Sequence, residues 1–258
     1  MVDGPAVADW LAYRIPVASP PDIAALLHEV VRPSIGQISA EIPDFRWFFL
    51  RYFDPAGLHL RLRLRVPVGV LTEVDALMEG ALNGGPAARL GWVRRLYAPE
   101  TGKFGAGPAL DGAERLFQLS SETALLCATP DRRGDRIAQA AAVTSLLADD
   151  LPEPARRRFL GVCANSAKTE AAVEPDLRGR AMRLDDRRRG VLAEADLGRT
   201  LSAFALAFRQ FLGSAARTLA PISDDDLRFH HIHLTNNRLG VFPAEEAAIA
   251  RLLLALGS

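Results

Sequence analysis

Cysteine and lysine are both scarce in this sequence of 258 residues. Its two cysteines, Cys127 and Cys163, are too few for a zinc cluster by themselves, and their apolar surroundings are typical of buried free thiols. Only Lys103 and Lys168 are lysines, so arginines supply almost all of the 31 cationic side chains, which 31 acidic side chains balance. This zero net charge excludes the usual electrostatic case for a general nucleic-acid or membrane-surface binder.

Long hydrophobic runs and the common cofactor motifs are missing as well. The longest apolar stretch near the end of the chain, residues 247–256, is interrupted by Arg251 and is too short to cross a bilayer. Residues 1–10 lack the basic start and apolar core of a secretory signal, so we expect a soluble, cytoplasmic protein. The sequence has no nucleophile elbow, phosphate-binding loop, Rossmann glycine fingerprint or Cys-x-x-Cys pair, which removes most nucleotide- and cofactor-dependent classes.

The composition is that of an ordinary globular protein. Hydrophobic residues make up 49% and charged residues 24% of the chain, which excludes a wholly disordered protein. The length suits one large domain or two closely fused lobes. We predict an α+β fold, with a mixed or antiparallel sheet and flanking helices over residues 1–109 and a mostly helical half over residues 110–258.

The N-terminal part alternates strand-like and helix-like segments. Residues 10–17 are typical of a short strand, and Ser19-Pro20-Pro21-Asp22 is typical of a helix start, because serine caps, proline suits the first turn and aspartate complements the positive helix end. Asp54-Pro55-Ala56-Gly57 predicts a turn between two strands. The strand before it is apolar on both faces, so we expect it to be central in the sheet. The predicted strands and helix that complete this part cover residues 45–53, 58–66, 70–82 and 91–97.

From residue 110 onward the pattern is helical. Residues 170–190, which are rich in arginine and aspartate and poor in apolar residues, are expected to form a loop. Ser223-Asp224-Asp225-Asp226 resembles a capping box, and Gly240 is placed to end the helix that follows it. The predicted helices cover residues 110–128, 132–149, 153–165, 192–219, 224–239 and 244–256.

An alternating strand carries the first candidate functional group. Between residues 58 and 66, His59, Arg61, Arg63 and Arg65 share one face, with successive side chains about 6–7 Å apart. Guanidinium groups bind carboxylate and carbonyl oxygens through paired hydrogen bonds, so this face is a candidate peptide or anion site. The alternative is an exposed sheet face whose arginines only maintain solubility.

A histidine-rich helix carries the second candidate functional group. His230, His233 and Asn237 lie on one face of the helix predicted over residues 224–239. A metal site would need further ligands that this spacing does not supply. The remaining interpretations are an imidazole that moves a proton and a polar helix face that forms hydrogen bonds to its neighbours.

Two shorter segments carry the third and fourth candidate functional groups. Residues 97–105 follow a predicted strand and offer a phenol, a carboxylate and an ammonium group in Tyr97, Glu100 and Lys103. Ser120-Ser121-Glu122 lies inside a predicted helix, where serine hydroxyls more often bond to their own backbone than to a ligand.

Taken in order, these segments resemble the C-terminal domain of lantibiotic dehydratases, which also occurs alone as a thiopeptide-type bacteriocin biosynthesis protein. The resemblance extends over nearly the whole chain and implies one domain over residues 1–258. Residues 97–105 are similar to the family's Tyr-x-Pro-Glu-x-x-Arg-Tyr-Gly-Gly loop, and residues 233–240 to its closing His-x-x-x-Asn-Arg-Leu motif. The other matching segments are Trp47-Phe48-Phe49-Leu50-Arg51-Tyr52-Phe53-Asp54-Pro55, His59-Leu60-Arg61-Leu62-Arg63 and Ser121-Glu122.

The resembled family has two catalytic branches. One eliminates glutamate from glutamylated serine or threonine to form dehydroalanine. The stand-alone branch joins two dehydroalanines of a leader-bearing peptide in a formal aza-[4+2] cycloaddition, and loss of water and of the leader as a carboxamide gives a pyridine-containing macrocycle. Here Lys103, Phe104 and Ala106 replace the loop's arginine, tyrosine and second glycine. Lysine keeps the positive charge but lacks the paired N–H groups of arginine, which favours a pyridine synthase over a glutamyl-eliminating subunit of a split dehydratase. A non-catalytic leader-binding scaffold is a further alternative of a different class.

The resemblance also implies roles for individual residues. His233 and Tyr97 are expected to donate and accept protons, and Arg61 and Arg63 to polarise or anchor backbone carbonyls. Glu100 and Ser121 are expected to orient the reacting amide. No metal, nucleotide or redox cofactor is required, and the expected partner is a dehydrated, leader-bearing precursor peptide. Independently of the resemblance, residues 170–190 are one candidate contact for its leader. The predicted substrate contacts are completed by Arg51, His59, Arg65, Lys103, Glu122, Asn237 and Arg238.

Overall fold

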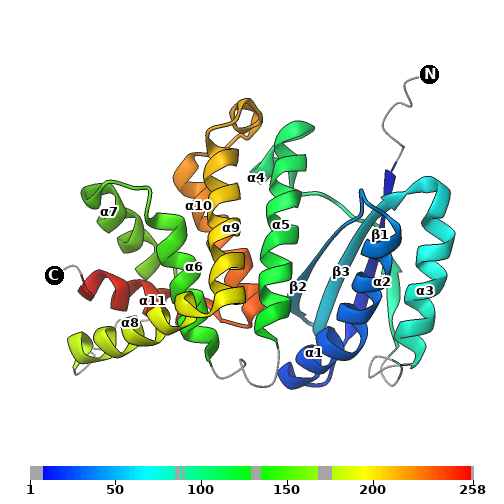
Figure 1. The fold of residues 1–258 in the computed structure, drawn as a ribbon, viewed down its shortest axis with the longest axis horizontal. Coiled ribbons are helices and arrows are strands. Elements are labelled where there is room, and N and C mark those ends of the chain that lie inside the picture. The colour runs from blue at the N-terminus through cyan, green and yellow to red at the C-terminus, as the bar shows by residue number, and fades with distance from the viewer. Residues whose placement is uncertain (1–7, 85–87, 89–90, 129–134, 168–175, 257–258) are drawn as a thin grey trace. The chain divides into compact units, whose positions relative to one another are not determined.

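The computed structural model describes residues 8–84, 88, 91–128, 135–167 and 176–256. The chain divides into two compact units, Met1–Pro99 and Glu100–Ser258. Figure 1 shows a sheet with helices in the first unit and helices throughout the second. This arrangement confirms the predicted α+β fold.

The first unit is built on an antiparallel sheet. In the part of the chain that the structure describes, its strand order is β2-β3-β1-β4. The predicted hairpin is therefore confirmed, but the prediction that its first strand is central is wrong, because β2 lies at an edge. Its second apolar face is covered by rings instead, since Phe48 contacts Trp10 and Tyr97. The strands are β1 (Ala8–Pro16), β2 (Arg46–Asp54), β3 (Gly57–Pro67) and β4 (Val93–Arg95).

One face of this sheet forms the core of the first unit. The side chains of Leu60, Leu62, Leu64 and Val66 on β3 are completely buried. Helices α1 (Pro20–Leu26), α2 (Arg32–Glu41) and α3 (Leu71–Gly84) lie on the same side of the sheet (Figure 1). A π-helical turn, η1 (Leu27–Val31), joins α1 to α2, and a 3-10 turn, η2 (Val68–Val70), precedes α3.

The start of α1 follows the predicted capping chemistry. The backbone N–H and the hydroxyl of Ser19 both donate to the carboxylate of Asp22 at 2.8 Å. The Ser19 side chain also faces the backbone N–H of Asp22, so the two residues form a capping box that stabilises the first turn, where helix N–H groups have no partner within the helix. The strand predicted over residues 91–97 is shorter than expected, since β4 covers only Val93–Arg95.

The second unit is a bundle of helices. Five of the six predicted helices match α5, α6, α7, α10 and α11, whereas the one predicted over residues 192–219 ends at Leu212, before Gly213 and a 3-10 turn, η5 (Ala215–Leu219). As predicted, Gly240 ends α10 in the left-handed conformation. The helices are α4 (Thr101–Phe104), α5 (Pro108–Cys127), α6 (Arg136–Ala148), α7 (Glu153–Ala164), α8 (Leu177–Ala193), α9 (Ala195–Leu212), α10 (Asp224–Leu239) and α11 (Pro243–Leu256).

The prediction of a loop over residues 170–190 is wrong from residue 177 onward, because α8 begins there. Residues 168–175 lie outside the described residues. The charges that suggested a loop pair along the helix instead. Asp185 accepts hydrogen bonds from Arg188 and Arg189, three and four residues later. Pairs at this spacing stabilise a helix, and buried Ala181 and Leu184 attach α8 to the bundle.

Both cysteines are buried free thiols, as predicted. Burial, with a contribution from the charge of Glu246, raises the pKa of Cys163 to about 12. None of the described helices is long and apolar enough to cross a membrane.

Candidate functional site

The second face of the sheet carries the predicted arginines. Strand register places Arg61 between Arg14 of β1 and Leu50 of β2, and it places Arg63 between Ala12 and Phe48. Arg95 of β4 pairs with Ala12 and therefore lies on the same face. Period-two alternation alone predicts that Arg61 and Arg63 share a face, but only pairing of the strands brings Arg14 and Arg95 beside them.

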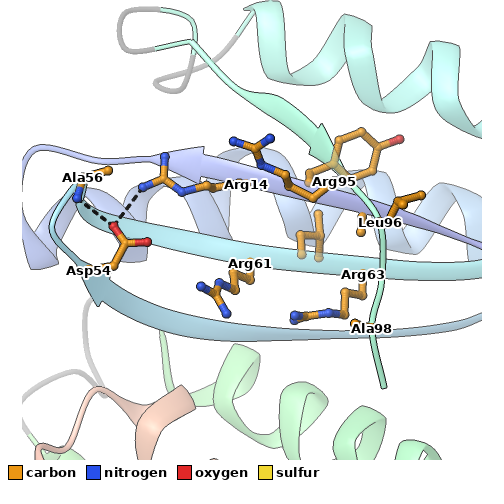
Figure 2. A pocket seen from close by; sticks show the side chains of 11 residues that line it. Arg14, Asp54, Ala56, Arg61, Arg63, Arg95, Leu96 and Ala98 are labelled. Carbon is orange, nitrogen blue, oxygen red and sulfur yellow. Dashed lines mark hydrogen bonds and ion pairs between the residues drawn. The ribbon is translucent and has the colours of Figure 1, made fainter. Parts of the chain in front are cut away.

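A pocket of about 470 Å³ lies over this face (Figure 2). Four of its lining residues are arginines, Arg14, Arg61, Arg63 and Arg95, whereas one, Asp54, is acidic. Guanidinium groups gathered around one cavity repel each other unless an anion or strong hydrogen-bond acceptors occupy it. The pocket is therefore suited to a carboxylate or to several peptide carbonyls.

Arg61 is held in place by two neighbours. Its Nε donates to Nε2 of His59 at 3.2 Å, and its guanidinium carbon lies 3.4 Å from the centroid of the Tyr52 ring. The Nδ1 of His59 lies 3.0 Å from the carbonyl oxygen of Gly57. These two contacts require the proton on Nδ1 and the lone pair on Nε2. His59 is completely buried, so it supports Arg61 from beneath the pocket surface.

The charge states around the pocket follow from the same contacts. Burial lowers the pKa of the His59 imidazole, with only partial compensation from its bond to Gly57, so the ring is neutral at pH 7. Burial raises the pKa of Asp54, but the N–H of Ala56 and the charge and hydrogen bond of Arg14 outweigh it and lower the pKa overall. Asp54 is therefore a carboxylate, and it accepts from Arg14 at 3.2 Å and from Ala56 at 2.9 Å.

Tyr97 joins this arginine face. Its ring lies 4.6 Å from the ring of Trp10 and 5.8 Å from that of Phe48, centroid to centroid. The guanidinium carbon of Arg63 lies 5.2 Å from the Tyr97 ring, within the range of a cation–π contact. Two residues predicted from separate motifs, Arg63 and Tyr97, are thus neighbours in the first unit.

Two predicted contacts in the first unit lie away from the pocket. Arg51 pairs with Leu60 in the strand register, which places it on the face that α1, α2 and α3 cover, opposite Arg61 and Arg63. Arg65 shares the arginine face but lies beside Trp10 and Arg46, beyond the residues that line the pocket.

The second unit has its own cluster, centred on His233 of α10. Nδ1 of His233 lies 3.0 Å and 3.2 Å from the two carboxylate oxygens of Glu246, which comes from α11. The imidazole stacks nearly parallel on the ring of Phe229. The hydrogen bond to Glu246 raises the pKa of His233 even though burial opposes it. Sequence analysis missed Glu246 because it lies 13 residues away on another helix, with no spacing that links it to His233.

Glu100 and Lys103 lie near this cluster. The Nζ of Lys103 is 2.5 Å from Oε2 of Glu100, and both side chains are about half exposed. The charges of Lys103 and Glu100 act on His233 in opposite directions, lowering and raising its pKa. Burial is the main cause that lowers the pKa of the neighbouring His230. The loop after residue 100 thus lies close to α10, where the ring of Phe104 is 6.2 Å from that of His230, centroid to centroid.

The remaining predicted residues are part of the bundle. Ser121 is completely buried and its hydroxyl donates to the carbonyl of Phe117 at 2.8 Å, which is the helix-interior alternative. Glu122 accepts from Gln118 at 2.9 Å. Arg238 is 1% exposed, with its guanidinium carbon 5.3 Å from the centroid of the Phe117 ring. Asn237 lies half-buried on α10, one turn after His233.

Comparison with known proteins identifies the family. The model for the lantibiotic biosynthesis dehydratase C-terminal domain matches residues 10–256, so the chain belongs to that family. No curated protein sequence matches this chain.

Two solved structures share the fold. One is MibB from Microbispora sp. 107891, a tRNA-dependent lantibiotic dehydratase, at 22% identity and a TM-score of 0.67. That match covers 99% of this chain but only 28% of MibB. The other is TsrL, at 14% identity and a TM-score of 0.64, with 97% of this chain and 94% of TsrL covered. At these identities the likeness concerns the fold.

Proposed function

We propose that this chain is a pyridine synthase that acts on a dehydrated, leader-bearing precursor peptide. Family membership supports a role in lanthipeptide or thiopeptide biosynthesis. The finer proposal is that two dehydroalanines of the peptide join in a formal aza-[4+2] cycloaddition. Loss of water and of the leader as a carboxamide then gives the pyridine ring and closes the macrocycle.

The observation that carries this proposal is Lys103, which stands where the resembled family has an arginine. In the elimination branch that arginine is expected to hold the glutamyl carboxylate of the substrate. Lysine binds a carboxylate as a point charge and lacks the paired N–H groups of a guanidinium, and its Nζ here lies 2.5 Å from Oε2 of Glu100. The replacement suits a reaction whose substrate brings no glutamyl group to this loop.

The cycloaddition makes modest demands that match the residues at hand. One amide must become an iminol, so that its C=N bond extends an alkene into a 2-azadiene, and the second dehydroalanine must be held at near-attack distance. Arg61 and Arg63 are suited to bind the backbone carbonyls of the reacting peptide. Tyr97 and His233 are suited to transfer the protons that iminol formation requires. The loss of water and the loss of the leader need protons as well.

Glutamate elimination from a glutamylated peptide is the second candidate. It is favoured by the excess of positive charge in the first unit, where Arg14, Arg61, Arg63 and Arg95 line a pocket with one acidic residue, Asp54. Such a pocket suits a free carboxylate as well as it suits carbonyls.

Mass spectrometry with two substrates separates the candidates. A pyridine synthase converts a peptide with two dehydroalanines and no glutamyl ester, releasing a carboxamide-ended leader and a cyclic core that has lost water. An eliminase ignores that peptide but frees glutamate from a glutamylated serine and leaves the leader attached. Freed glutamate with an intact, linear peptide overturns the pyridine-synthase proposal. Unchanged product yield in both Tyr97→Ala and His233→Ala, in the reconstituted pathway, indicates a scaffold.

A further inference from the structure

We propose that Glu246 is a positioning residue that fixes the tautomer of His233 and directs its Nε2 outward for proton transfer. The role of His233 in proton transfer rests on the proposed function above. The contact with Glu246 is independent of it.

The geometry is that of a carboxylate–imidazole pair. Nδ1 of His233 is within hydrogen-bond distance of both oxygens of Glu246, at 3.0 Å and 3.2 Å. Because a carboxylate only accepts, Nδ1 must carry the proton. Nε2 is at the opposite side of the ring, and 37% of the His233 side chain is exposed, whereas Glu246 is 9% exposed. The buried partner holds the ring and the exposed partner can reach a ligand.

The neighbours of the pair keep it rigid. The adjacent Glu245 forms two hydrogen bonds with Arg136 of α6, at 2.7 Å and 2.8 Å, and accepts from the N–H of Phe242 at 2.9 Å. These contacts fix the first turn of α11, from which Glu246 projects. The ring of Phe229 lies nearly parallel to the imidazole, 6.3 Å away centroid to centroid. His233 is therefore oriented by a hydrogen bond and a ring contact together.

Among the groups that shift the pKa of His233, Glu246 has the largest effect. Glu246 faces it from α11, Lys103 and Glu100 act from the region of α4, and His230 lies on the same helix. Cys163 of α7 lies near Glu246 but is a neutral thiol, because burial raises its pKa to about 12. Without the Glu246 charge, burial and Lys103 would both disfavour the protonated imidazole.

The test uses Glu246→Gln and the control variant Glu153→Gln in the full chain without substrate. The second variant makes the same chemical change at an exposed residue of α7, whose carboxylate lies 3.9 Å from Arg156. A pH titration followed by NMR should show the pKa of His233 falling by about one unit in Glu246→Gln, in line with the loss of one adjacent charge. The pKa of His233 should stay within error of wild type in Glu153→Gln. Nitrogen chemical shifts should show the Nδ1–H tautomer in wild type and a mixture in Glu246→Ala.

Turnover gives the second readout. With a substrate that the wild type converts, Glu246→Gln should lower kcat about tenfold or more with little change in KM. Because the imidazole with its proton on Nδ1 accepts a proton at Nε2, the lower pKa should shift the acidic limb of the pH–rate profile to lower pH. Glu246→Asp should restore part of the lost kcat. An unchanged His233 pKa in Glu246→Gln, or an altered pKa with unchanged kcat, overturns the positioning role. A wild type that converts neither substrate refutes the proposed function, while the titration still decides whether Glu246 controls His233.

Discussion

Arg61 donates its Nε–H to Nε2 of His59 at 3.2 Å. Strand alternation places both side chains on one polar face of β3, which by itself gives no reason to assign them different roles. His59 is completely buried and Arg61 is only half-buried and lines the pocket, so the two have different roles. The imidazole is a neutral acceptor that aims the guanidinium, and its position two residues earlier on β3 makes this contact possible.

His59→Phe is expected to disturb Arg61 without changing the sheet. Phenylalanine keeps the ring volume but has no acceptor for the Nε–H of Arg61. A hydrogen bond from a charged donor contributes about 1.5–3 kcal/mol, so kcat/KM should fall by about tenfold or more. Steady-state kinetics with the peptide substrate measures the loss, and a thermal melt verifies that the variant is folded. Wild-type kinetics in a folded variant would show that Arg61 needs no such support.

Arg95→Gln is expected to weaken peptide binding, because Arg95 is one of four cations around the pocket. Loss of one charge-assisted hydrogen bond should raise the Kd for the precursor peptide about tenfold and reduce the salt dependence of binding. Arg115→Gln is the matched control, since Arg115 is an exposed partner of Asp111 in the second unit. Fluorescence anisotropy at two ionic strengths measures both effects. Equal affinities for the two variants would contradict the assignment of the pocket.

The variants Tyr97→Phe and Tyr97→Ala are expected to distinguish the role of the Tyr97 hydroxyl from the role of its ring. Phenylalanine preserves the ring contacts with Trp10, Phe48 and Arg63, so Tyr97→Phe should melt at a higher temperature than Tyr97→Ala. Alanine removes those contacts and should also lower the melting temperature by several degrees. If the phenol moves a proton, both variants should lose at least about a hundredfold in kcat. Full turnover by Tyr97→Phe would restrict Tyr97 to packing.

Folding stability should depend on His231 below neutral pH. This imidazole is buried among the rings of Phe104, Phe117 and Phe208, and burial lowers its pKa to about 3. The unfolded chain binds a proton near pH 6.5 and the folded chain does not. The contribution of neutral His231 to the free energy of unfolding is therefore fully present above pH 6.5. It is lost at up to about 1.4 kcal/mol per pH unit as the pH falls from 6.5 toward 3.

Urea unfolding between pH 7 and 4 tests this dependence. His231→Phe should flatten the slope, whereas His28→Gln, at an exposed position of η1, should leave it unchanged. The same slope in wild type and His231→Phe would show that other groups control the acid sensitivity.

Local patterns predicted much of the secondary structure. The turn at Asp54-Pro55-Ala56-Gly57, the cap at Ser19 and the helix end at Gly240 all appear as expected, since each depends on residues close in sequence. The errors arose where distant contacts decide. Residues 177–190 form a helix because their charges pair along it and its apolar side chains find the bundle. The doubly apolar β2 lies at an edge of the sheet, where Trp10 and Tyr97 from other segments cover Phe48.

The sequence by itself determined the candidate groups: a strand whose period of two puts His59, Arg61 and Arg63 on one face, and a helix that presents His233. Only the tertiary structure decided their surroundings. Strand pairing added Arg14 and Arg95 to the pocket and placed Arg51 on the opposite face. Helix packing brought Glu246 to His233. The physical reason is that backbone periodicity fixes which side chains share a face, whereas the partner of a charged or buried group is set by segments far away in the chain.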